Sequence, residues 1–228
     1  MKFDFDPVSA ISIANLAKKH DVKIIHCHNY RATSIVLLSQ MFYKTKIIIS
    51  KRSSVDSNLS PVALKVYKNS HIDAIIGSSI DIKKSLIDTE IEVEKLFVIP
   101  NAVDLKRVET TDAKHRIKNS LPPHSLLIGT VASFNSHKDY PTLIKAASMV
   151  LKTHPEVLFL AVGGGKLAPE IKKLINNRNI SERFILAGQQ DNIYDYFNAF
   201  DIFVFTPKTE SNGTTLLDAL NRSLPSEK

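Results

Sequence analysis

Residues 126–166, "LLIGTVASFNSHKDYPTLIKAASMVLKTHPEVLFLAVGGGK", contain the pattern that decides the fold class. Two runs rich in Leu, Ile and Val, 126–132 and 157–162, flank a segment with a helical apolar stripe, made of Leu143, Ile144, Ala147, Val150 and Leu151. Continuous apolar runs are typical of strands covered on both faces, and the stripe is typical of an amphipathic helix. Pro141 suits the first turn of that helix. The stretch therefore predicts a strand, a helix and a second, parallel strand.

The same alternation extends along most of the chain. Further helical patterns cover 169–179 and 193–200, and further strand candidates are 22–27, 46–50, 73–77, 96–99, 183–187 and 201–205. Strands that alternate with helices are typical of α/β proteins with parallel sheets. We therefore expect an α/β fold throughout.

The alternation stops between Asn101 and Ser125. This segment has no strand pattern, carries many charges and ends near a Pro-Pro pair. We interpret 103–106 as a linker and "DAKHRIKNSL" (112–121) as the first helix of a second domain. The sequence thus predicts two domains, residues 1–104 and 105–228.

The composition is that of an ordinary globular protein. Of the 228 residues, 43% are hydrophobic and 23% are charged. No apolar run approaches the roughly 20 residues that span a bilayer, and the start "MKFDFDPVSAIS" lacks the pattern of a secretory signal, so we expect a cytoplasmic protein. The single cysteine, Cys27, lies in an apolar run and is interpreted as a small buried hydrophobe. We expect no disulfide, metal site or cofactor.

The net charge of +7 is unevenly distributed. Ten Lys and Arg residues lie between Lys18 and Ile72, against Asp21 and Asp56 alone. Such a basic segment is compatible with nucleic acid, anionic lipid, a phosphorylated substrate or merely a solvated surface. Tyr30, Phe42 and Tyr43 do not form a stacking series, so we expect no nucleic-acid partner.

Four polar loops follow the strands of the second half: "SFNSHKDY" (133–140), "GGGK" (163–166), "GQQDN" (188–192) and "TPKTESNG" (206–213). Ligands of open α/β sheets bind where strands end and helices begin. Glycine permits close backbone approach, and helix N-termini offer free N–H groups to phosphate. With Lys138 as a cation, these loops predict a cleft for a nucleotide or a sugar phosphate, although a lone Gly-Gly-Gly is often only a tight turn.

Two carboxylates belong to the last of these loops and to the helix after it. Glu210 precedes the helix, and Asp218 lies about two turns into it. Carboxylates accept hydrogen bonds from the hydroxyl groups of a polyol. Alternatively, Glu210 only favours the helix N-terminus electrostatically, and Asp218 is solvated.

The chain from Val22 to Pro225 resembles the family 4 retaining glycosyltransferases, also described as glycosyl transferases group 1. Five blocks carry the resemblance in the family's order: "VKIIHCHNY" (22–30), "DAIIGSSIDIKKSLIDTEIEVEKLFVIPNAVD" (73–104), "IGTVASFNSHKDYPTLIKAA" (128–147), "LFLAVGGGKLAPEIKKL" (158–174) and "FILAGQQDNIYDYFNAFDIFVFTPKTESNGTTLLDAL" (184–220). The resemblance implies the GT-B fold, with an acceptor-side Rossmann-like domain followed by a donor-binding one. It also implies a retaining, metal-independent transfer of a hexose from a nucleotide-sugar to a glycan or lipid-linked acceptor.

The resemblance also assigns roles to single residues. The family's Glu-x7-Glu falls on Glu210, expected to meet sugar hydroxyls, and on Asp218, expected to meet the ribose. Lys138 matches the lysine that neutralises the departing diphosphate. His28 matches a position near the reacting centre or acceptor, or is only a strand-end histidine. The full set of expected donor-binding residues is Ser133, Asn135, Gly163, Gly164, Gly188, Gln189, Gly213, Thr214, Thr215 and Asp218.

The chain also departs from the family pattern. Ser133 stands where the family has arginine, and the second Glu is shortened to Asp218. The first strand–loop–helix unit and the last strands with the returning C-terminal helix are not found, so we expect both domains to be incomplete. The alternative to an enzyme is a non-catalytic remnant that binds nucleotide weakly or not at all.

The basic segment between Lys18 and Ile72 also suggests peripheral contact with an anionic membrane, at the inner membrane face.

Overall fold

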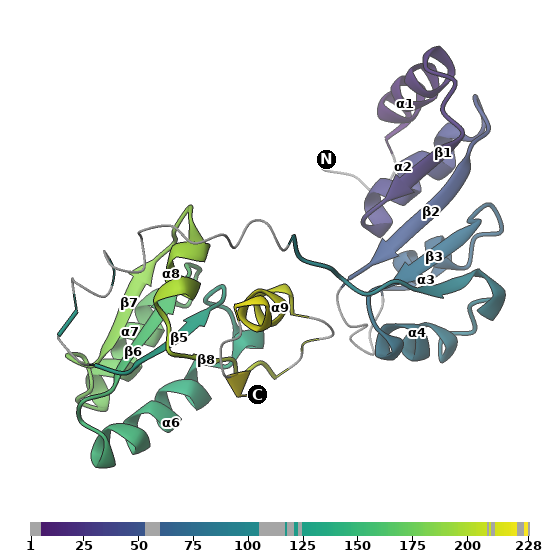
Figure 1. Ribbon diagram of the computed structural model, residues 1–228. Coiled ribbons are helices and arrows are strands. Elements are labelled where there is room, and N and C mark those ends of the chain that lie inside the picture. The colour runs from purple at the N-terminus through teal and green to yellow at the C-terminus, as the bar shows by residue number, and fades with distance from the viewer. Residues whose placement is uncertain are drawn as a thin grey trace. The chain divides into compact units, whose positions relative to one another are not determined.

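The computed structural model describes residues 6–52, 60–104, 117, 121–122, 125–208, 210, 213–222 and 226–227. The chain forms two compact units, Met1–Asn101 and Ala102–Lys228, which divide three residues before the expected boundary. Most of the expected helix at 112–121 and half of the linker at 103–106 lie outside the described residues. Figure 1 shows the α/β architecture of each unit.

The N-terminal unit is built on a four-stranded parallel sheet in the order β1-β2-β3-β4. Its elements are α1 (Pro7–Lys19), β1 (Ile24–Cys27), α2 (Tyr30–Ser39), β2 (Lys46–Lys51), α3 (Pro61–Tyr67), β3 (Ala74–Gly77), α4 (Ile80–Ile87), η1 (Val93–Lys95) and β4 (Leu96–Val98). Ile47, Ile49 and Ile75 are fully buried along the central strands. The apolar runs of the sequence therefore form the centre of this sheet.

Each α-helix of this unit begins at a polar side chain that caps it. Asp6, Asn29, Ser60 and Ser79 accept hydrogen bonds from backbone N–H groups in the first turns of α1, α2, α3 and α4. These caps satisfy N–H groups that have no partner within the helix. The local sequence therefore indicates where each of these helices begins.

The C-terminal unit contains a five-stranded parallel sheet in the order β7-β6-β5-β8-β9. Its elements are β5 (Leu127–Val131), η3 (Ser136–Lys138), α6 (Tyr140–Thr153), β6 (Leu158–Val162), α7 (Ala168–Asn177), β7 (Phe184–Gly188), α8 (Ile193–Ala199), β8 (Ile202–Val204), α9 (Thr214–Asn221) and β9 (Ser226–Glu227). The strands β6 and β7 lie on one side of β5, and β8 and β9 lie on the other. The connecting helices therefore cover both faces of the sheet, as α6 and α8 do in Figure 1. This is the doubly wound arrangement.

The structure confirms the predicted α/β fold with parallel sheets. All eight predicted strands are present, and their ends differ by at most two residues. Pro141 lies in the first turn of α6, and Leu143, Ile144 and Ala147 on its stripe are buried. Cys27 is buried, and burial raises the pKa of its thiol, although a hydrogen bond with Thr33 acts in the opposite direction. Cys27 is therefore a small buried residue, as expected.

Candidate functional site

The topology of the C-terminal unit identifies one preferred place for a ligand. Strands β5 and β8 are neighbours, but the chain leaves β5 toward β6 on one side and leaves β8 toward β9 on the other. At such a switch point the loops after the two strands diverge and leave a crevice at their carboxyl ends. The loops concerned are 132–139, after β5, and 205–213, after β8.

Lys138 and Glu210 meet at this switch point. The Lys138 ammonium donates a hydrogen bond to the Glu210 carboxylate, and their side chains are only 20% and 22% exposed. The Lys138 Nζ atom also lies 4.8 Å from the centre of the Phe205 ring. The two residues with the most specific predicted roles, 72 positions apart, are therefore in direct contact.

Two hydrogen bonds to backbone carbonyl groups hold the two loops together. The N–H of Lys208 donates to the His137 carbonyl at 2.9 Å, and the Thr206 hydroxyl donates to the Asp139 carbonyl at 3.4 Å. The Asn135 side chain accepts from the N–H of His137 at 3.1 Å and so shapes the short helix η3, which ends at Lys138. The position of Lys138 is consequently set by the local backbone.

The loops after β5, β6 and β7 are also in contact. The N–H of Phe134 donates to the Gly164 carbonyl at 2.8 Å, and the N–H of Gly163 donates to the Gly188 carbonyl at 2.9 Å. A Cβ atom at Gly164 would lie 3.5 Å from the Gln189 Cβ. Asn135 donates to the Ser133 hydroxyl at 2.8 Å. These contacts bring Ser133, Asn135, Gly163, Gly164, Gly188 and Gln189 to one edge of the sheet.

Gly163 is required by the close approach of two of these loops. Its φ is +152°, and a Cβ atom there would lie 2.0 Å from the Ala132 carbonyl oxygen. Gly165 has the same φ, and its Cβ would lie 2.5 Å from the Phe134 carbonyl oxygen. The sequence pattern pointed to Gly163 and Gly164 but missed Gly165, because nothing in the sequence shows which backbone lies opposite.

Helix α9 begins at the same edge. Its cap residue, Gly213, provides no side-chain hydrogen bond, and Thr214 and Thr215 form its first turn. The first N–H groups of a helix have no partner within it, which favours anions at this end. Asp218 lies in α9 and is 5% exposed, so the alternative of a solvated Asp218 is wrong.

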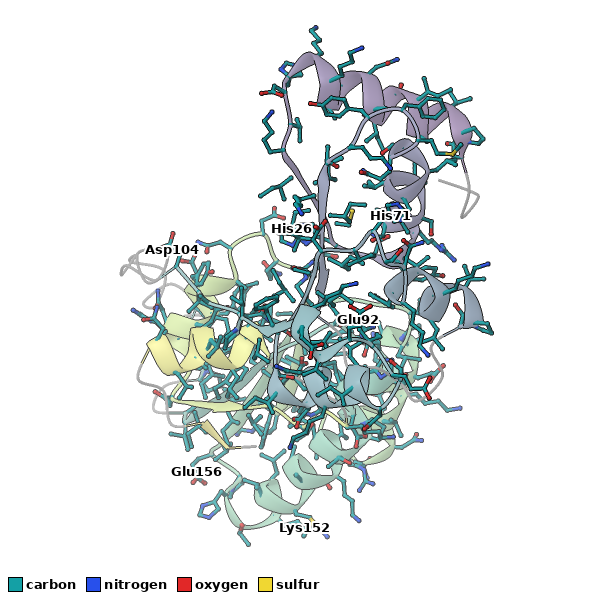
Figure 2. The ribbon with its side chains drawn as sticks, turned by 90° about the vertical axis from the view of Figure 1, so that its right-hand side faces the viewer. His26, His71, Glu92, Asp104, Lys152 and Glu156 are labelled. Carbon is teal, nitrogen blue, oxygen red and sulfur yellow. The ribbon has the colours of Figure 1, made fainter. Side chains whose placement is uncertain are left out.

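His28 lies in the other unit, just after β1. It is exposed, and its ring centre lies 4.6 Å from that of His26, which is labelled in Figure 2. His26 Nε2 lies 2.7 Å from the Ser50 hydroxyl, and burial, with a smaller contribution from His28, lowers the pKa of His26. The contacts of His28 with the described residues do not decide its role, so its assignment stays a prediction.

The described part of the chain also contains a large cavity away from the switch point. It has a volume of about 750 Å³ and is lined by residues of 148–155 and 176–183, where α6 and α7 end and β6 and β7 begin. Figure 2 labels Lys152 and Glu156 in this region. The cations there, Lys152, Arg178 and Arg183, lie near helix C-termini, whose carbonyl groups attract cations. Because the helix ends account for these cations without a ligand, we prefer the switch point as the candidate site.

Membrane-spanning helices and metal-binding clusters of side chains are both absent from the described residues. No helix in this part of the chain is long and apolar enough to cross a membrane. The same residues contain no group of three or more His, Cys, Asp or Glu side chains arranged to hold a metal ion.

Comparison with known families and proteins extends these observations. The family model described as "Glycosyl transferases group 1" matches residues 111–226, about half of the chain, and that described as "Glycosyltransferase Family 4" matches residues 1–107. The chain is 23% identical over 223 residues to the phosphatidylinositol N-acetylglucosaminyltransferase GPI3 subunit of Saccharomyces cerevisiae, covering 93% of this chain and 49% of the relative. It is 24% identical over 238 residues to an Escherichia coli UDP-Gal:alpha-D-GlcNAc-diphosphoundecaprenol alpha-1,3-galactosyltransferase, covering 96% and 61%.

Solved structures agree on the fold. Anabaena Alr3699/HepE in complex with UDP and glucose superposes with a TM-score of 0.85 at 17% identity, covering 95% of this chain and 61% of that one. Sucrose-phosphate synthase from Thermosynechococcus elongatus gives a TM-score of 0.81 at 19% identity, covering 96% and 59%. The chain therefore has the GT-B glycosyltransferase fold, and it spans about half the length of the curated relatives it matches first.

Proposed function

This chain belongs to the family of glycosyl transferases group 1, and from that premise we propose that it serves to transfer a hexose from a nucleotide-sugar to a glycan or lipid-linked acceptor, with retention of configuration. The observation that carries the proposal is the contact of Lys138 with Glu210 at the switch point of the donor-side sheet. Two relatives support the acceptor class, since one is named for a diphosphoundecaprenol-linked glycan and the other for phosphatidylinositol.

In this proposal, each group at the switch point has one task. Lys138 and the N-terminus of α9 neutralise the diphosphate as its oxygen takes the electron pair of the breaking bond to the sugar. Glu210 accepts hydrogen bonds from sugar hydroxyls, and Asp218 contacts the ribose. Charge neutralisation is thereby assigned to protein groups, without a metal ion or cofactor. Nucleotide binding is supported by a structural neighbour that is in complex with UDP.

Substitution of Glu210 by glutamine tests the enzyme against the non-catalytic alternative. We expect donor hydrolysis, assayed with UDP- and GDP-sugars, to fall about fivefold to tenfold, because a neutral acceptor replaces a charged one. UDP alone should bind at least as tightly as before, since the carboxylate no longer competes for Lys138. Absence of hydrolysis by the unsubstituted chain with any donor would instead support a binding-only protein.

We also propose cytoplasmic residence with peripheral contact to an anionic membrane, through a surface on the N-terminal unit. In the turn after α2, Met41 is 76% exposed and Phe42 is 57% exposed. Beside them, Lys23, Lys44 and Lys46 line a cavity of about 490 Å³. Exposed apolar side chains with lysines nearby are suited to an interface with anionic headgroups, and here Lys44 is the principal cation because Lys23 pairs with Asp21 and Lys46 with Asp73. This surface lies where β1 and β2 begin, at the opposite end of β1 from His28.

Sedimentation with lipid vesicles tests this contact. We expect the chain to bind phosphatidylcholine vesicles that contain phosphatidylglycerol, and to bind pure phosphatidylcholine vesicles far less. Replacing both Met41 and Phe42 by serine should weaken binding about tenfold, since two apolar side chains lose their burial. Met149→Ser on α6, where Met149 is 61% exposed, is the matched control. Equal binding to both kinds of vesicle would contradict the proposed contact.

A further inference from the structure

The Phe205 ring lies directly beneath the candidate phosphate cation. Phe205 follows β8 immediately and is 2% exposed. Its ring centre is 4.8 Å from Lys138 Nζ, and it packs on Phe203 with ring centres 6.2 Å apart. An ammonium within about 6 Å of an aromatic ring is attracted to it, and the attraction grows when the cation is partly removed from water. Lys138 is in that situation because its side chain is mostly buried.

The same ring also contacts the start of α9. A Cβ atom at Gly213 would lie 3.1 Å from Phe205 Cε1 and 3.3 Å from Glu210 Cγ. The Gly213 backbone thus approaches the ring more closely than most residues would allow. One aromatic ring therefore borders two groups expected to receive a diphosphate, namely the Lys138 ammonium and the N-terminus of α9.

Phe205 and Glu210 play different parts when a donor enters. Lys138 is paired with Glu210. On the proposed function, a bound donor draws the ammonium toward the diphosphate and the carboxylate toward the sugar, so this pair is weakened. The aromatic contact needs no such exchange, because the ring face holds no competing charge. Without it, the flexible four-carbon stem of the lysine has to be ordered on binding.

We propose that Phe205 is a positioning residue for the donor diphosphate, with its ring holding the Lys138 ammonium beside the N-terminus of α9. The inference rests on the proposed function, because it requires that a nucleoside diphosphate binds at Lys138. It adds a residue that the sequence pattern marked only as part of an apolar strand. It also predicts that loss of the ring weakens binding of the diphosphate and leaves binding of the nucleoside unchanged.

The ratio of UDP affinity to uridine affinity isolates the diphosphate contribution. We expect Phe205→Leu to lower this ratio about fivefold, as fits the loss of a partly desolvated cation–π contact. Phe205→Met also removes the ring and serves if the leucine variant does not fold. Phe205→Tyr retains an aromatic face and should keep the ratio near that of the unsubstituted chain. Phe184→Leu is the matched control, since Phe184 is buried on β7, packs on Phe159 and should affect stability without changing the ratio.

A double-mutant cycle separates positioning from a general packing effect. In a Lys138→Met background, Phe205→Leu should leave the ratio unchanged, because the ring has no cation to hold. A ratio equal to that of the unsubstituted chain in Phe205→Leu and Phe205→Met, or an equal decrease in both backgrounds, would overturn the inference. If the unsubstituted chain binds UDP no better than uridine, the proposed function fails first, and the inference fails with it.

Discussion

Replacement of Gly163 by alanine is expected to lower the free energy of unfolding of the C-terminal unit by about 2–6 kcal/mol. Two costs add: a left-handed backbone conformation costs an L-residue about 1–3 kcal/mol, and overpacking costs about 1–3 kcal/mol. Both apply, since Gly163 has a φ of +152° and its Cβ would lie 2.0 Å from the Ala132 carbonyl oxygen. The obstructing atom belongs to backbone that pairs with β6, so it cannot move alone.

Two other glycines provide graded controls for this prediction. Gly188 has a φ of +72°, but a Cβ atom there would meet nothing within 4 Å, so Gly188→Ala should cost only the conformational part, about 1–3 kcal/mol. Gly164→Ala meets only ordinary contacts and should be nearly neutral. Unfolding in urea can be monitored by circular dichroism, because the chain has no tryptophan to serve as a fluorescent probe. Equal stabilities of the Gly163 and Gly164 variants would contradict the close loop packing.

Replacement of Lys138 by alanine should weaken UDP binding by about 1.5–3 kcal/mol, the contribution typical of a charged hydrogen bond. The substitution removes the cation at the switch point and leaves the Glu210 carboxylate, 22% exposed, facing the diphosphate. Serine at position 133, where the family has arginine, offers no cation in compensation. Affinity for uridine, which lacks phosphate, should change little.

Calorimetry with UDP, GDP and uridine measures these affinities. Lys173→Ala is the matched control, because Lys173 is exposed in the middle of α7 and its removal causes the same change in net charge. We expect UDP to bind that variant as it binds the unsubstituted chain. An unchanged UDP affinity in the Lys138 variant would remove Lys138 from the site.

The sequence predicted the elements well because their signals are local. The apolar runs around Ile47, Ile75 and Leu158 became strands, and the stripe at Leu143 and Ile144 became the buried face of α6. The candidate loops were also predictable, since parallel strands end at one edge of a sheet. Local patterns suffice for these features because each depends on residues close together in the chain.

The contacts inside the site could not be predicted in the same way. The pairing of Lys138 with Glu210 depends on the adjacency of β5 and β8, which only the strand order reveals. Phe205 was indistinguishable from its apolar neighbours, and Gly165 from any turn glycine. For Asp218, sequence left both a ligand role and a solvated surface open, and burial decided against the second. Each of these features depends on which distant backbone or side chain lies opposite.

The seven glycines of the chain offer the most direct test of the donor site. With ¹⁵N-labelled glycine, a spectrum contains one backbone amide signal for each, assignable by single substitution. Gly163, Gly164, Gly165 and Gly213 lie in the loops at the candidate site and Gly188 ends β7 there, whereas Gly77 ends β3 of the N-terminal unit and Gly129 lies in the middle of β5. On addition of UDP, we predict shifts at Gly163, Gly164, Gly188 and Gly213, with Gly77 and Gly129 unmoved. Shifts confined to Gly77, or none even at millimolar UDP, would contradict a nucleotide site at the β5–β8 switch point.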